Sequence, residues 1–86
     1  MNGKEGLVVA RHRGKRGRAY EVEYKQDNKA EVTFSYLCPY CDKEANVKNE
    51  YSTGLDIIEK GMFYELLACN HCSEIAEVRF LPHNRI

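Results

Sequence analysis

Apolar and polar residues alternate with a period of two over much of the chain. In residues 20–24, tyrosine and valine share one parity and glutamate takes the other, and residues 30–36 repeat the pattern. Such alternation of β-branched and aromatic residues predicts strands with one buried face. The polar residues 26–28 between the two runs predict a turn. Together with the apolar run at 7–10, residues 7–36 are expected to form a three-stranded β-meander.

The same pattern continues in the second half of the chain. Apolar residues in 45–51 suggest another strand, the apolar run 63–68 leads directly into a cysteine, and residues 76–80 alternate before Pro82 ends the pattern. The apolar positions expected to face the core of the meander are Tyr20, Val22, Tyr24, Ala30, Val32, Phe34 and Tyr36.

Residues 55–60 are consistent with two structures. Thr53 can cap one helical turn that ends at Gly61, or residues 59–61 can turn a hairpin into the following strand. No segment has the length and 3.6-residue period of a substantial helix. The chain is therefore predicted to be all-β or nearly so, one domain over residues 1–86 with at most one short helical turn.

Four cysteines form two C-x-x-C pairs, Cys38-Pro39-Tyr40-Cys41 and Cys69-Asn70-His71-Cys72, with 27 residues between them. Two residues between cysteines let the backbone curl so that both sulfurs point at one ion and amide N–H groups can donate to the thiolates. Two such knuckles supply the four tetrahedral sulfur ligands that structural Zn²⁺ prefers. We therefore predict one Zn²⁺ bound by Cys38, Cys41, Cys69 and Cys72. Leu37 and Leu67 are expected to shield the site, and Lys43 and His71 to offset part of its negative charge.

This arrangement resembles the zinc-ribbon superfamily over residues 30–81. The resemblance rests on the order strand, CPYC, strand, long loop, strand, CNHC, strand. It implies a ribbon at residues 37–81 and a role of the kind that zinc ribbons have in transcription factors, RNA polymerase subunits and ribosomal proteins. Many ribbons carry glycine after the second cysteine of a knuckle, whereas this chain has Asp42 and Ser73. No specific family is assigned.

Other uses of the cysteines are two disulfides, four free thiols, or iron in a rubredoxin-like site. The first six residues lack the apolar segment of a signal peptide, and no apolar run is long enough to span a bilayer. We therefore expect a cytoplasmic protein without a membrane partner. Thiols stay reduced there, which favours metal over disulfides.

CPYC is also a motif typical of glutaredoxins, in which the first cysteine begins a helix. Here residues 42–50 lack a helical apolar stripe, and the second C-x-x-C has no role in that mechanism. A thiol redox protein is thus a remote alternative. Four cysteine ligands leave zinc no open position for water. We expect no enzymatic activity, no catalytic residues and no small-molecule substrate.

Charge is unevenly distributed although the net charge is zero. Residues 1–20 hold six basic residues and one acid, a net +5, whereas residues 21–86 hold seven basic and twelve acidic residues, a net −5. Five cations fall within residues 11–18, called here the basic segment, and they are Arg11, Arg13, Lys15, Arg16 and Arg18. We expect this segment to form a hairpin tip that binds DNA or RNA phosphates.

The function predicted first is that of a nucleic-acid-associated accessory factor in transcription or translation, which contacts nucleic acid or a nucleic-acid-processing protein. The alternative is a protein-binding adaptor that docks on a basic partner through its acidic ribbon. The basic segment itself can also be interpreted as a solvated loop without a partner.

Overall fold

The computed structural model describes residues 11–86, so the strand expected at 7–10 lies outside the described residues. The all-β prediction is confirmed. The elements are β1 (Lys15–Lys25), β2 (Lys29–Leu37), β3 (Glu44–Tyr51), α1 (Leu55–Lys60), β4 (Phe63–Ala68), β5 (Ile75–Phe80) and the 3-10 turn η1 (Pro82–Asn84).

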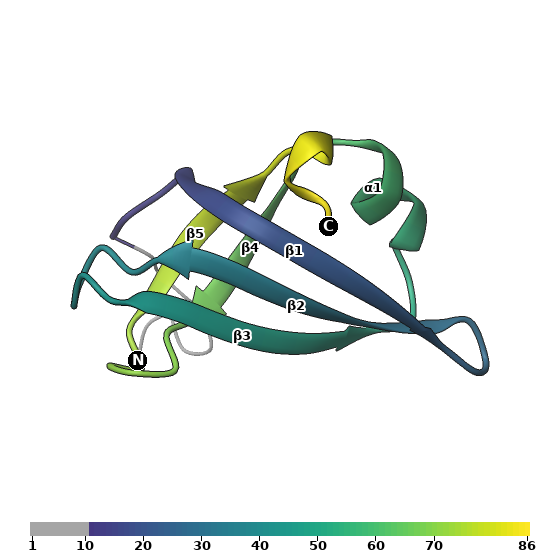
Figure 1. Cartoon of the computed structure of the whole chain (residues 1–86), viewed down its shortest axis with the longest axis horizontal. Coiled ribbons are helices and arrows are strands. Elements are labelled where there is room, and N and C mark those ends of the chain that lie inside the picture. Colours follow the sequence, from purple (N-terminus) through teal and green to yellow (C-terminus); the bar gives the residue numbers. More distant parts are fainter. Residues whose placement is uncertain (1–10) are drawn as a thin grey trace, which may run out of the picture.

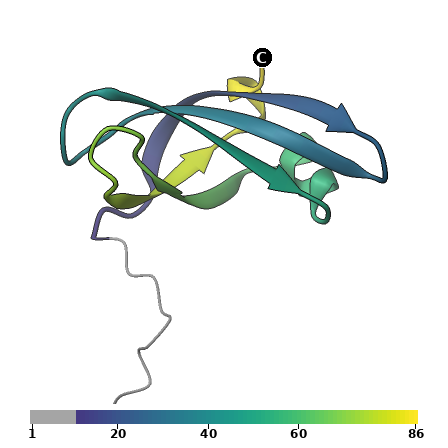
Figure 2. The ribbon, with the colours of Figure 1, turned by 90° about the horizontal axis from the view of Figure 1, so that it is seen from below.

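The five strands form one curled sheet in the order β3-β2-β1-β5-β4. Neighbouring strands are antiparallel except β1 and β5, which are parallel and share only the register pairs Lys15↔Val78 and Arg16↔Arg79. Figures 1 and 2 show β4 and β5 lying across one face of the meander of β1, β2 and β3. The fold therefore consists of a three-stranded meander and a hairpin that are joined through β1.

Within residues 11–86, three consecutive antiparallel strands form a meander over residues 15–51. Lys15–Arg18 belong to its first strand β1, and β3 follows β2 as the third. The turn expected at residues 26–28 is confirmed, and Asp27 and Asn28 adopt the positive φ values of 63° and 59° that their short polar side chains tolerate.

The alternating residues build the core as expected. Tyr20, Val32 and Phe34 are fully buried, whereas Tyr24 is 50% exposed because it lies near the free end of the β1–β2 hairpin. The hairpin of β4 and β5 supplies the opposite side of the core, through Phe63, Leu67, Ala76, Val78 and Phe80. Aromatic rings meet at its centre, with Phe34 and Phe80 centroids 5.0 Å apart.

Side chains link the outermost strand β3 to the β4–β5 hairpin, although β3 and β4 share no backbone ladder. The Tyr51 hydroxyl donates to Glu65 Oε2 at 2.6 Å. Nearer the other end of β3, the side-chain oxygen of Asn70 accepts from the backbone N–H of Asn46 at 2.9 Å. These contacts satisfy part of an open sheet edge and hold the sheet in its curled form.

The segment between β3 and β4 is the helical turn α1, so the hairpin interpretation of residues 59–61 is wrong. Its N-cap is Gly54, with φ 72°, and no side chain caps it, so Thr53 does not have the role expected of it. Gly61 ends the helix as predicted. Ile58 is buried, and its carbonyl accepts a hydrogen bond from the core hydroxyl of Tyr20 at 2.8 Å.

Gly17 permits a close approach between β1 and β5. It lies beside a bulge at Arg18, and a Cβ at Gly17 would lie 2.2 Å from Phe80 Cε1. Because Phe80 is fully buried, its ring has little room to move. We expect Gly17→Ala to lower the free energy of unfolding by about 1–3 kcal/mol through overpacking.

Urea unfolding of the metal-loaded protein measures this loss. Gly61→Ala is the matched control, since a Cβ there meets only Ile57 O at an ordinary 3.7 Å. Equal midpoints for Gly17→Ala and wild type would show that the close contact at Phe80 does not constrain residue 17.

Candidate metal centre

The two cysteine pairs lie at the tips of two hairpins. Cys38 and Cys41 lie in the connection between β2 and β3, and Cys69 and Cys72 lie in the connection between β4 and β5. The curl of the sheet brings both tips to the same end of the molecule. The order strand, knuckle, strand, connection, strand, knuckle, strand is as predicted, with α1 inside the long connection.

The four sulfurs converge on one point. Cys38 Sγ lies 3.7 Å from Cys72 Sγ, and Cys41 Sγ lies 3.8 Å from Cys69 Sγ. All four sulfurs lie within 4.8 Å of one another. Ligands about 2.3 Å from a central ion in a tetrahedron are about 3.8 Å apart, so the cluster has the dimensions of a four-thiolate metal site. No pair is within disulfide-bond length of about 2.05 Å.

Both knuckles use one pattern of backbone hydrogen bonds. In the first, Cys38 N donates to Lys43 O and Asp42 N donates to Cys38 O, each at 2.9 Å. In the second, Cys69 N donates to Glu74 O and Ser73 N donates to Cys69 O, also at 2.9 Å. The local chain geometry therefore repeats, and each knuckle aims two sulfurs at the shared point.

Amide groups inside each knuckle also point at the first sulfur. Tyr40 N donates to Cys38 Sγ at 3.4 Å, and His71 N donates to Cys69 Sγ at 3.3 Å. Such N–H groups stabilise negative charge on sulfur. The cysteines they serve are the two buried ones, Cys38 and Cys69.

The residues that replace the glycines of many ribbons adopt a glycine-like conformation. Asp42 has φ 60° and Ser73 has φ 68°. Each follows the second cysteine of its knuckle, where the chain must turn back toward the next strand. The departure from the ribbon pattern thus changes the residue and leaves a left-handed backbone conformation in place.

The thiols of the metal-free cluster differ in acidity. Burial opposes ionisation of Cys69, but hydrogen bonds from the N–H groups of His71 and Cys72 and from the side chains of Cys38 and Cys41 together outweigh it and lower the pKa of Cys69 to about 7. At Cys72 the N–H of Glu74 favours the thiolate, yet burial and the three neighbouring sulfurs raise its pKa to about 12. Several negative sulfurs at this distance repel one another, which is the condition that a bound cation relieves.

The shielding of the site differs in part from the prediction. Leu67 is fully buried as expected, but Leu37 is 46% exposed, because it has the opposite strand parity to Tyr36 and Cys38. Tyr36 takes the shielding position, and its hydroxyl donates to Leu67 O at 3.4 Å. Burial, followed by the charge of the thiolates, raises the pKa of Tyr36, so this hydroxyl stays protonated.

The charged neighbours of the site are exposed. Lys43 is exposed, and the ring Nε2 of His71 lies 3.1 Å from the backbone oxygen of Glu44 on β3. The sequence patterns do not single out Asn70, whose side chain accepts a hydrogen bond from β3 and so links the second knuckle to that strand. An asparagine inside a C-x-x-C pair is the only signal that could have suggested this contact.

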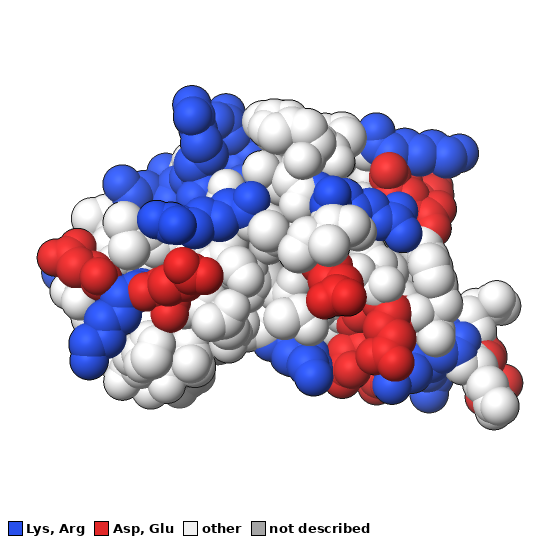
Figure 3. All heavy atoms as spheres, in the orientation of Figure 1, with Lys and Arg blue, Asp and Glu red and all other residues white. Residues whose placement is uncertain are grey.

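The basic segment does not form a hairpin tip. Lys15–Arg18 begin β1, and the preceding residues run beside β5, where Glu77 N donates to His12 O at 2.9 Å and Gly14 N donates to Glu77 Oε1 at 3.1 Å. All five cations of the segment are exposed. Figure 3 shows lysine and arginine gathered over the start of β1, whereas acidic and basic residues intermingle toward the β1–β2 turn.

Comparison of the chain with models of known protein families, with curated proteins and with solved structures finds no match. The likeness to zinc ribbons therefore rests on the cysteines and the strand order alone. Within residues 11–86, no helix is long and apolar enough to cross a membrane. The fold and site define a small β protein with a four-cysteine cluster that can hold a metal ion.

Proposed function

We propose that this protein is a structural-zinc protein that binds nucleic acid through the basic segment. The carrying observation is that this segment leads into the start of β1 with all five of its cations exposed. The metal would hold the two hairpins together, and the sheet would hold the cations in place. The protein would have no enzymatic activity of its own, since four cysteine ligands complete a tetrahedral shell and leave no position for a reacting water.

Zinc is proposed over iron because a site with four protein ligands is typical of structural zinc. A domain of this size also often needs a structural metal for stability. The residues that would hold it are Cys38, Cys41, Cys69 and Cys72. The ribbon-like order of strands and knuckles supports the narrower proposal of an accessory factor in transcription or translation.

The pairing of charges supports nucleic acid as the partner. Among the described residues, Arg18 pairs with Glu44 at 3.7 Å, but the other four cations of the basic segment have no carboxylate within ion-pair distance. Unpaired, exposed cations are available to phosphates, and their contacts with phosphate release counterions.

The acidic residues of the meander give weaker support to the adaptor alternative than the basic segment gives to nucleic-acid binding. Glu23, Glu31 and Glu50 lie opposite one another on adjacent strands and form an acidic row. However, Lys25 and Lys48 lie within 4.0 Å of Glu31, and Lys25 also pairs with Glu23. Much of this charge is thus neutralised within the sheet, which leaves less of it for a basic partner.

Reversing the charge of the basic segment tests the proposal. We expect Arg13→Glu, Lys15→Glu and Arg16→Glu together to abolish binding of short DNA and RNA while the fold persists, because these side chains are exposed. Anisotropy titrations at two salt concentrations measure the effect. The wild-type slope of log K against log salt should be about 0.7–0.9 per phosphate contacted.

The matched control reverses three other exposed lysines, Lys29, Lys48 and Lys60, and changes the net charge by the same amount. It should bind nearly as well as wild type. No binding by wild type at low salt would refute the nucleic-acid proposal and favour the adaptor. Equal losses in both triple variants would mean that only net charge matters.

A further inference from the structure

The outer face of β4, β5 and the start of β1 carries an aromatic residue beside two arginines. Tyr64 pairs in register with Arg79, and Arg79 pairs with Arg16. The neighbours of these residues along β4 and β5, such as Phe63 and Phe80, are buried. The three side chains therefore form a row across three strands on the face opposite the core.

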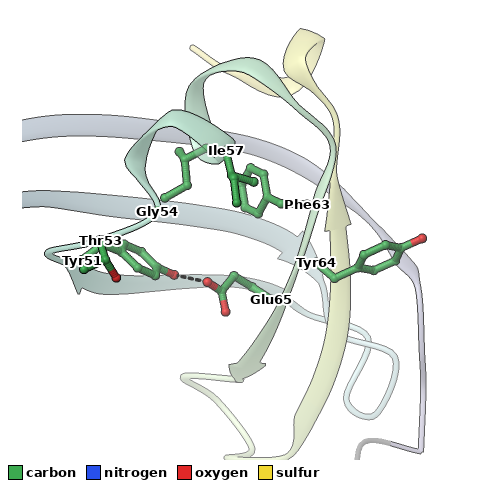
Figure 4. Close-up of a pocket in the computed structure, with 8 residues that line it drawn as sticks. Tyr51, Thr53, Gly54, Ile57, Phe63, Tyr64 and Glu65 are labelled. Carbon is green, nitrogen blue, oxygen red and sulfur yellow. Dashed lines mark hydrogen bonds between the residues drawn. The ribbon is translucent and has the colours of Figure 1, made fainter.

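The ring of Tyr64 is available at this face. It is 48% exposed, and Leu66, two residues further along β4, is 45% exposed. Figure 4 shows Tyr64 pointing away from the cavity of about 180 Å³ beside α1, where Tyr51 bonds to Glu65. A Cβ at Gly14 would lie 3.8 Å from Tyr64 Cε2, so the backbone of Gly14 passes beside the ring, and the lack of a side chain there limits how much of the ring is covered.

The arginines of the row are free to bind an anion. Within residues 11–86, neither Arg16 nor Arg79 has an ion-pair partner. Arg79 Nε is covered and lacks a hydrogen-bond partner in the same region, so the stem of this side chain lies against the sheet. The carboxylate of Glu77, two residues before Arg79 on β5, accepts a hydrogen bond from Gly14 N.

A second aromatic group lies near the start of β5, formed by a residue that precedes β1 and a residue of the first knuckle. The rings of His12 and Tyr40 meet edge to face with centroids 4.7 Å apart, and the Arg11 guanidinium lies 5.3 Å from the Tyr40 ring centroid. The Tyr40 hydroxyl donates to Ile75 O, four residues before Arg79 on β5 and thus about 13 Å from it along the strand. Tyr40 is partly buried against the core, so this group lies at the cysteine end of β5, apart from the row of Tyr64, Arg79 and Arg16.

We propose that this face binds single-stranded nucleic acid, with a base stacked on Tyr64 and phosphates held by Arg16 and Arg79. The inference rests on the proposed function and adds the class of nucleic acid. Stacking on a side chain needs a base whose face is uncovered, which a single strand offers and a duplex does not. Aromatic rings beside a positively charged path are the features that bind single strands without a sequence requirement.

The test compares Tyr64→Leu with Tyr24→Leu in the full, zinc-loaded chain. Tyr24 is the matched control, since it is 50% exposed and lies near the far end of β1. The probes are a fluorescein-labelled oligo(dT) of about 12 nucleotides, within the known range of site sizes, and a labelled duplex of equal length. Tyr64→Leu should weaken oligo(dT) binding by roughly 5- to 150-fold and leave duplex binding and the salt slope unchanged. Tyr64→Phe and Tyr24→Leu should bind as wild type does.

A measurement on wild type needs no variant. In an NMR titration with oligo(dT), the Tyr64 ring resonances should shift upfield more than those of Tyr24. Wild type that binds duplex as tightly as oligo(dT), or unshifted Tyr64 resonances at saturation, would overturn the single-strand inference. The proposed function would survive that result if the triple charge reversal still abolished binding. Failure of wild type to bind either probe would remove both.

Discussion

Chelation of the metal is expected to unfold the protein, and the purified chain is expected to carry about one zinc per molecule. The cluster brings four sulfurs within 4.8 Å at the end of the molecule where the two hairpins meet. Without a cation, any thiolates there repel one another, and the hairpin of β4 and β5 is joined to the meander by the short pairing with β1, by core packing and by a few side-chain hydrogen bonds. Metal binding and folding are coupled by about 10–16 kcal/mol in zinc-finger peptides, which exceeds the stability of most small domains.

Metal analysis and circular dichroism during titration with a strong chelator measure this result. Lowering the pH should act in the same direction, because protons compete with the metal for the thiolates. Readdition of Zn²⁺ should restore the native spectrum, which separates metal loss from irreversible damage. A chain that contains neither zinc nor iron, has no titratable thiols and stays folded in chelator would instead have disulfides.

Replacement of any one ligand by serine should have the second largest effect. Cys38→Ser and Cys69→Ser remove buried sulfurs that accept amide N–H groups, so we expect loss of zinc and a fall in unfolding free energy on the order of 5 kcal/mol, comparable to the whole stability of a small domain. Cys41→Ser and Cys72→Ser should also release zinc. The readouts are zinc content and thermal unfolding.

Histidine provides the control, because imidazole is also a zinc ligand. Cys72 is only partly buried, so Cys72→His has room for the larger side chain and should keep most of the zinc. A Cys69→Ser protein that stays folded with a full complement of zinc would count decisively against a site made of four cysteines.

Local patterns predicted most of the elements and singled out the cysteines. Alternation from Tyr20 to Tyr36 shows which side chains face the core. It can be read from the sequence because it depends only on residues that are close along the chain. The C-x-x-C spacing likewise reports a local backbone turn, so the convergence of four sulfurs could be expected from the sequence alone.

Features that depend on distant pairing were not predicted. Lys15–Arg18 resemble a loop in composition, yet they extend β1 because Val78 and Arg79 provide a partner strand 63 positions along the chain. The exposure of Leu37, by contrast, follows from local strand parity, because Leu37 is out of phase with the core-facing series that ends at Tyr36. For residues 55–60 the sequence is consistent with a helix or a hairpin. The structure has a helix, which begins after Gly54 in a left-handed conformation.

The parallel ladder between β1 and β5 has two register pairs, whereas each antiparallel ladder has six or more. Short ladders open at lower free energy than long ones, so local unfolding should begin where the two hairpins join. Arg16 on β1 and Arg79 on β5 are register partners, one on each strand of this ladder. A ligand that contacts both would bind only the closed form and would suppress the opening by mass action. Ligand binding to this face would therefore make the two hairpins unfold together rather than separately.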